Sequence, residues 1–128
     1  MEVITSELVP EVINVKVKYL RKNGYNTLQD WLDASSNHVY IGRDLSAYVK
    51  GSRGSKWKNP FTIKKYGTAQ EACRRYRQYI LNTPHLLHSL DELEGKVLGC
   101  WCKGENECHG EVLAQLIWQQ KIFPTIKF

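Results

Sequence analysis

The stretch KVLGCWC, residues 96 to 102, limits the fold more than any other part of the chain. It is short and apolar and ends in a polar loop, so it predicts a buried strand. After the loop, residues 109 to 122 predict a helix with an apolar stripe that includes Val112, Leu113, Leu116 and Ile117. A buried strand that leads into a helix is typical of an α/β domain, because the helix covers the apolar strand.

Strands and helices also interleave upstream of this stretch. The Val- and Ile-rich residues 12 to 20 and residues 38 to 43 predict strands. Three segments predict helices: 28–34 with Thr27 as N-cap, the segment 67–84 with the capping box Thr68 and Glu71, and the shorter segment 84–95. Residues 60–63 predict at most an edge strand. We therefore predict a small α/β domain of two or three layers, with a mixed or mostly parallel sheet of undetermined order and flanking helices.

The length and composition predict one domain over residues 1–128. A chain of 128 residues with 42% hydrophobic residues can bury a core without disulfide bonds. No apolar run is long enough to span a membrane, and the N-terminus lacks the pattern of a signal peptide. Three of the four cysteines lie within nine residues, which favours intracellular chemistry or a metal over disulfides. We therefore expect a cytoplasmic protein.

Basic residues concentrate in the middle of the chain. Residues 50 to 77 contain nine Lys and Arg residues and one acid, Glu71. Such a block attracts phosphates, whether they belong to a nucleotide or to a nucleic acid. A solvated basic face without a partner is the alternative interpretation.

The segment GCWCKGENECHGE, residues 99 to 111, carries three cysteines and a histidine where the last strand meets the last helix. One interpretation is a metal site formed by Cys100, Cys102, Cys108 and His109, with zinc as the metal. This set is not favoured, because adjacent residues such as Cys108 and His109 diverge on a helix. A second interpretation is a catalytic or ligand-contacting thiol, in which Cys108 or Cys102 is the nucleophile and His109 is a base or a hydrogen-bond donor to phosphate. The helix N-terminus would lower the pKa of Cys108. The third is that the cysteines are buried for structural reasons.

Three motifs together resemble the domain of unknown function 4326 family. They are VYIGR at 39–43, SKWKNPF at 55–61 and LGCWCKGENECHGEVL at 98–113, and the resemblance covers residues 12–118. The family is spread among bacteria, phages and large DNA viruses, so a viral member would act in the host cell. This chain departs from the family pattern in two places. Lys58 replaces a glycine, and the loop over residues 44–60 is longer than the family pattern implies.

The resemblance implies a ligand site at the motif residues: Gly42, Arg43, Ser55, Lys56, Trp57, Asn59, Pro60, Cys100, Cys102, Cys108 and His109. The chemistry of several of them agrees with this assignment. Arg43 offers a fork for phosphate or carboxylate, Trp57 offers a face on which a base can stack, and Lys56 adds a point charge. We expect His109 and Cys108 to be the catalytic candidates, and the others to bind the ligand.

We therefore predict a domain that binds a small phosphate-bearing ligand, a nucleotide or a nucleotide-derived metabolite. If the chain is an enzyme, group transfer or hydrolysis is expected. The alternatives are a nucleic-acid-binding module with a structural, zinc-held Cys/His corner, and a viral or phage protein that binds another protein through its long loop. No cofactor is favoured apart from the zinc alternative. The oligomeric state does not follow from the sequence.

Overall fold

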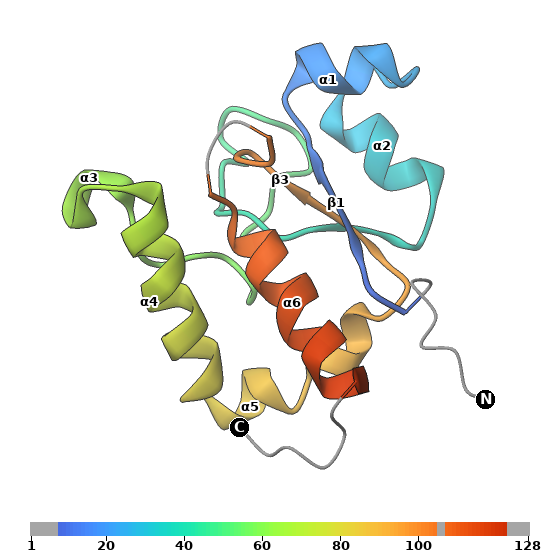
Figure 1. Cartoon of the computed structure of the whole chain (residues 1–128). Coiled ribbons are helices and arrows are strands. Elements are labelled where there is room, and N and C mark those ends of the chain that lie inside the picture. Colours follow the sequence, from blue (N-terminus) through green and yellow to red (C-terminus); the bar gives the residue numbers. More distant parts are fainter. Residues whose placement is uncertain (1–7, 105–106, 123–128) are drawn as a thin grey trace.

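Three parallel strands form the centre of the computed structural model, which describes residues 8–104 and 107–122 (Figure 1). They are β1 (Glu11–Asn14), β2 (His38–Tyr40) and β3 (Val97–Cys100), in the order β1-β3-β2. In the register, Gly99 lies between Ile13 and Tyr40. The predicted α/β class is confirmed, and the sheet is parallel throughout. The strand that carries Cys100 is the central one.

Helices cover both faces of this sheet (Figure 1). The helical elements are α1 (Val17–Lys22), α2 (Leu28–Ala34), α3 (Ile63–Tyr66), α4 (Ala69–Leu81), α5 (Pro84–Leu87), the 3-10 turn η1 (Leu90–Leu93) and α6 (His109–Ile122). Alternate residues of β3 face opposite layers: Leu98 and Cys100 pack in the core with α4 and α6, whereas Gly99 meets Trp31 of α2. This alternation is what a strand buried on both faces requires.

Threonine caps explain where several helices begin. Thr27 Oγ1 accepts the Asp30 N–H at 3.1 Å, and Thr68 Oγ1 accepts the Glu71 N–H at 3.0 Å. Each bond satisfies one of the N–H groups that the first turn of a helix leaves without a backbone partner. The predicted helix 28–34 and the predicted Thr68-capped helix are therefore confirmed, as is the helix over residues 109–122.

The predicted strand 12–20 is wrong after Asn14, because Val17–Lys22 is helix α1. The Asn14 side chain turns the backbone at this point: its Oδ1 accepts the Lys16 N–H at 2.9 Å, and its Nδ2 donates to the Lys103 carbonyl at 3.0 Å. Leu20 of α1 is then buried against α2, whereas Val17 stays 40% exposed. The alternating pattern of residues 12–20 thus spans an element boundary.

Two other predicted elements also differ. The predicted edge strand 60–63 leads into helix α3, because Thr62 Oγ1 caps that helix by accepting the Lys65 N–H at 3.1 Å. The predicted helix 84–95 is divided into α5 and η1. The Ser89 hydroxyl lies between them and donates to the His85 carbonyl at 2.7 Å. Such side-chain bonds to nearby carbonyls compete with regular helix.

The long loop between β2 and α3 folds back on the strand that it follows. The Leu45 N–H donates to the Ser52 carbonyl at 2.9 Å, and the Ser55 N–H donates to the Gly42 carbonyl at 3.1 Å. Ser52 is fully buried, and its hydroxyl donates to the Val49 carbonyl. The predicted loop 44–60 is therefore an ordered part of the fold, held by its own hydrogen bonds. Over residues 8–104 and 107–122, no helix has both the length and the apolar character needed to cross a membrane.

Replacing Glu71 with glutamine is expected to remove part of the acid sensitivity of the fold. Arg74 and Arg75 donate to this carboxylate and hold its pKa at about 2, below its ordinary 4.5. A lowered pKa in the folded state stabilises the protein above pH 4.5, and this stabilisation is lost as the pH falls towards about 2. Urea unfolding should show a gap between the wild type and E71Q that narrows over this range. A gap that stays constant would contradict the assignment.

Candidate functional site

The carboxyl ends of β2 and β3 are tied together by Tyr40. Its hydroxyl donates to the Arg43 carbonyl at 2.6 Å and accepts the Trp101 indole N–H at 2.8 Å. The Tyr40 ring lies so close to Gly42 that a Cβ there would be 2.4 Å from the hydroxyl oxygen. Gly42 is therefore required by the packing of this ring. Burial raises the pKa of Tyr40, so the neutral hydroxyl is available to bridge the two strand ends.

A pocket of about 500 Å³ opens at this edge of the sheet. It brings together residues from the end of β2, the long loop, α3, the first turns of α4 and the segment before α6. The lining residues are Gly42, Arg43, Leu45, Asn59, Phe61, Thr62, Ile63, Lys64, Ala69, Ala72, Cys73, Trp101, Cys102, Glu107 and His109. Five of the predicted site residues thus lie along one cavity: Gly42, Arg43, Asn59, Cys102 and His109.

Arg43 and Asn59 meet at the pocket. The Arg43 side chain is exposed, and its Nε and Nη2 each lie 3.4 Å from the Asn59 carbonyl oxygen. These are long contacts, so the guanidinium keeps most of its capacity to donate to another group. The Asn59 side-chain oxygen accepts the Phe61 N–H at 2.9 Å, which shapes the loop before α3.

Ser55, Lys56 and Trp57 lie outside the pocket lining. Trp57 is only 2% exposed, and its indole donates to Glu92 at 3.2 Å. The structure therefore leaves no free Trp57 face for the predicted base stacking. Lys56 pairs with the same carboxylate at 2.8 Å, and the Ser55 hydroxyl oxygen accepts the Trp57 N–H at 3.0 Å. Lys56 and Trp57 thus anchor the long loop to Glu92 of η1, and Ser55 shapes the loop next to them.

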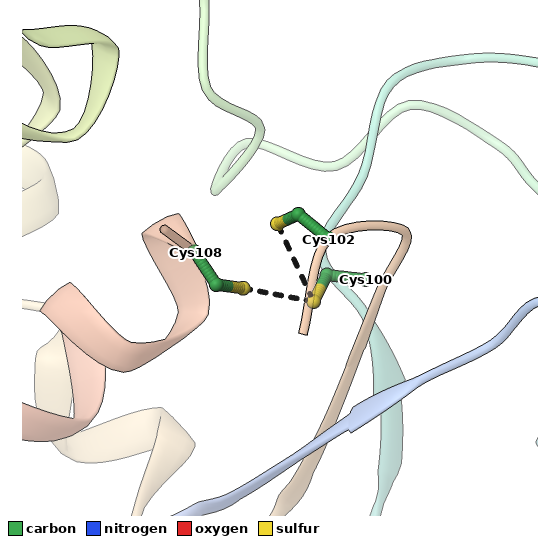
Figure 2. A group of neighbouring side chains, drawn as sticks. All are labelled: Cys100, Cys102 and Cys108. Carbon is green, nitrogen blue, oxygen red and sulfur yellow. Dashed lines mark hydrogen bonds between the residues drawn. The ribbon is translucent and has the colours of Figure 1, made fainter. Parts of the chain in front are cut away.

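The three clustered cysteines converge where β3 meets α6 (Figure 2). Cys100 Sγ lies 2.9 Å from Cys108 Sγ and 3.8 Å from Cys102 Sγ, and all three sulfurs lie within 4.8 Å of one another. All are free thiols. Cys100 and Cys108 are buried, whereas Cys102 is half-buried and lines the pocket.

The thiols share hydrogen bonds that separate their pKa values. Bonds from the Cys102 and Cys108 thiols lower the pKa of Cys100, and the bond that Cys102 donates to Cys100 raises the pKa of Cys102. The pKa of Cys108 is raised as well, mainly because its thiol donates to Cys100. We predicted the lowered pKa at Cys108. The structure places it at Cys100, since the other two thiols surround that sulfur.

His109 is not part of the cysteine cluster. Its Nε2 lies 2.8 Å from the Ile41 carbonyl oxygen, and its ring meets Tyr76 edge-on with centroids 5.1 Å apart. Because a carbonyl can only accept, Nε2 carries the proton. Burial lowers the pKa of the ring, so His109 is neutral with an unprotonated Nδ1. The alternative four-ligand metal set is thus reduced to three cysteines in this geometry.

Gly110 explains why α6 begins so close to the sheet. A Cβ at this position would lie 2.8 Å from Val12 Cγ1 and 3.0 Å from Ile41 Cδ1. The absence of a side chain lets the first turn of α6 reach the ends of the strands. This approach is what places Cys108 beside Cys100 and His109 beside the Ile41 carbonyl.

Sequence reasoning missed several pocket residues. Lys64, Phe61 and Cys73 line the cavity from α3, the segment before it and α4. Lys64 was visible only as one charge within the basic block, and Cys73 only as a cysteine on a helix. Trp101 sits inside the recognised cysteine motif, so its position next to Cys102 was the available signal.

The chain is similar to a viral protein of unassigned function. The uncharacterized protein R718 of Acanthamoeba polyphaga mimivirus is 45% identical over 85 residues, which span 61% of this chain and 65% of that protein. The match thus covers slightly less than two thirds of the relative. No solved structure matches the chain significantly. The family model "Domain of unknown function (DUF4326)" matches residues 26–119, so the predicted resemblance is confirmed from residue 26 onward. The chain belongs to this family.

Proposed function

We propose that this domain binds a phosphate-bearing small molecule, of the size of a mononucleotide, in the pocket at the carboxyl edge of the sheet. One observation carries the proposal: two cations, Arg43 and Lys64, border a cavity of about 500 Å³ that Phe61 and Trp101 also line. Pockets of this size hold nucleotide-sized ligands. Ligands of open α/β sheets bind beyond the carboxyl ends of the strands.

The phosphate of such a ligand requires positive charge and hydrogen-bond donors, whereas its ring requires apolar surface, and the pocket offers both. Arg43 can donate two parallel hydrogen bonds to a phosphate, and Lys64 adds a point charge. The side chains of Phe61, Ile63 and Trp101 supply apolar surface for a ring. Glu107 is the carboxylate in the lining, and a carboxylate can accept from the N–H groups of a base.

Group transfer or hydrolysis would depend on the residues that line the pocket. His109 is neutral, and its unprotonated Nδ1 is the state that a general base requires. Cys102 also lines the cavity, whereas Cys108 lies behind it. The raised pKa of Cys102, caused by its bond to Cys100, keeps this thiol protonated and disfavours it as a nucleophile. In this proposal His109 is therefore the catalytic candidate, and the role predicted for Cys108 is not retained.

The nucleic-acid alternative is weakened because several residues of the basic block already have partners within the protein. Lys56 pairs with Glu92, Arg74 and Arg75 pair with Glu71, and Arg77 donates to Gln119 at 2.9 Å. The carboxylates of Glu71 and Glu92 reduce the charge that the block presents to a polyanion, and the bond to Gln119 occupies a donor of Arg77. A mononucleotide in a pocket and a multi-phosphate contact differ in salt dependence, because the latter releases many counterions.

Nuclear magnetic resonance can test this proposal through the Trp101 indole N–H. We expect adenosine, guanosine, cytidine or uridine monophosphate to shift this resonance and to leave the exposed Trp118 indole unchanged. Arg43→Ala should weaken binding at least about tenfold, since charged hydrogen bonds contribute about 1.5–3 kcal/mol. Arg53→Ala is the matched control, because Arg53 is exposed on the same loop and outside the lining.

Two outcomes would contradict the proposal. One is equal weakening by R43A and R53A, which would indicate a diffuse electrostatic contact. The other is that no monophosphate moves the Trp101 resonance while a single-stranded oligonucleotide binds with steep salt dependence. That result would favour the nucleic-acid alternative.

A further inference from the structure

We propose that Cys100, Cys102 and Cys108 form a three-thiolate site for one zinc-type divalent metal ion, with a fourth coordination position filled from outside the cluster. The three sulfurs come from the end of β3 and from the residue that precedes α6, and Figure 2 shows them directed at one point. Over the described residues, these three cysteines form the one group of His, Cys, Asp or Glu side chains with at least three ligand atoms close enough to hold an ion.

The sulfur separations are close to those of a tetrahedral zinc site. Two Zn–S bonds of about 2.3 Å place their sulfurs about 3.8 Å apart. Cys102 Sγ and Cys100 Sγ are 3.8 Å apart, and Cys108 Sγ is 2.9 Å from Cys100 Sγ. The Cys108–Cys100 pair must open by roughly 0.9 Å on this zinc geometry, and the Cys102–Cys108 pair lies within 4.8 Å. Rotation about Cα–Cβ bonds can provide such an adjustment without moving the backbone.

Positive charge lies next to the cluster. Lys103 follows Cys102 in the chain, and its ammonium pairs with Glu111. Positive charge near cysteine sulfurs favours the thiolate form that binds a metal. Metal binding would release the protons of the thiols to solvent.

The fourth position can be reached from the pocket. Cys102 lines the cavity, whereas Cys100 and Cys108 are 0% and 2% exposed. Three protein ligands with an open fourth position is the arrangement of catalytic zinc sites. Metal binding does not depend on the proposed phosphate ligand, because the three sulfurs belong to the protein. The two proposals are therefore tested separately.

A disulfide between Cys100 and Cys108 is the competing use of these thiols. It would need the two sulfurs to close from 2.9 Å to about 2.05 Å. The position of Cys102 favours the metal site over the disulfide. A disulfide would use only Cys100 and Cys108, whereas a metal ion would also use the neighbouring sulfur of Cys102.

The test is metal binding by the full chain, purified without a tag and without chelators, and with no nucleotide added. Elemental analysis should find about one zinc per chain, the stoichiometry of a mononuclear site. Replacing zinc with Co²⁺ should produce intense thiolate-to-cobalt charge-transfer absorption. Cys102 is the one half-buried thiol of the cluster, so thiol titration should find it reactive in the metal-free protein and protected in the metal-bound protein.

Cys102→Ser should weaken Co²⁺ binding by at least about 10–100-fold, because it removes a ligand while its half-buried position spares the core. Cys100→Ser should do the same, but Cys100 is fully buried, so C102S is the decisive variant if C100S does not fold. Cys73→Ser is the control, because Cys73 lies outside the cluster.

The proposal is overturned if the chain binds Co²⁺ without charge-transfer absorption or binds none. It is also overturned if C102S and C73S have equal affinity, or if the protein carries a Cys100–Cys108 disulfide and no metal. A failure of zinc binding would not change the titration of the Trp101 resonance with nucleotides. The metal site and the nucleotide pocket can therefore be rejected independently.

Discussion

Replacing Trp31 with alanine is expected to lower the free energy of unfolding by about 3–5 kcal/mol, as for other buried tryptophans. Trp31 is 2% exposed and stacks on the His38 ring with centroids 4.4 Å apart. Helices α1 and α2 cover one face of the sheet with the side chains of Leu20, Leu28 and Trp31. Trp31 is the largest of the three. A loss of this size is a large fraction of the total stability of a small domain, about 5–15 kcal/mol.

Urea unfolding followed by circular dichroism measures this effect. Trp118→Ala is the matched control, because Trp118 is 47% exposed on α6 and its loss should change stability by no more than about 0.5 kcal/mol. If W31A and W118A lost similar amounts, the α1–α2 layer would not be packed on the sheet as described.

Gly99→Ala is expected to cost about 1–3 kcal/mol, although it adds a single methyl group. A Cβ at this position would lie 2.7 Å from Val15 Cγ1 and 2.8 Å from Trp31 Cη2. Both neighbours are stiff and buried, so the strand or the tryptophan must move. Alanine loses less backbone entropy than glycine on folding, which acts in the opposite direction but by a smaller amount than the steric cost.

The double variant W31A/G99A tests the cause of this loss. The added methyl group should cost less stability when the Trp31 ring is absent. The stability lost by W31A/G99A should therefore be smaller than the sum of the losses of W31A and G99A, by about 0.5–3 kcal/mol. Gly54→Ala is the control, since a Cβ there meets only exposed Asp44, whose Cβ would lie 3.2 Å away. Additive losses would show that Trp31 is not the limiting neighbour.

The elements that sequence reasoning predicted correctly depend on interactions between near neighbours. The caps Thr27 and Thr68 each bond to an N–H three residues later, so the hydrogen bond itself is visible as a spacing. The apolar stripe of α6 is likewise local. The strand 12–20 failed because the bend at Asn14 depends on the carbonyls of Trp101 and Lys103, far along the chain.

The site shows the same division. Sequence motifs indicated the pocket residues Arg43, Asn59, Cys102 and His109 before any fold was available. They also indicated Trp57, whose aromatic ring suits both base stacking and burial. Only the contact with Glu92 and the bond from the Tyr76 hydroxyl to the Trp57 carbonyl, 2.6 Å long, decide for burial.

The α/β class, the capped helices and the cysteine motif could be predicted from the amino-acid sequence, because they follow from spacings of a few residues. The strand order β1-β3-β2, the pocket between β2 and α4, and the exclusion of His109 from the cysteine cluster became known only from the folded structure. Each of these depends on contacts between residues dozens of positions apart, such as Tyr40 with Trp101 and His109 with Ile41. Short-range patterns carry no information about which distant residues meet, since that is settled by how the layers pack.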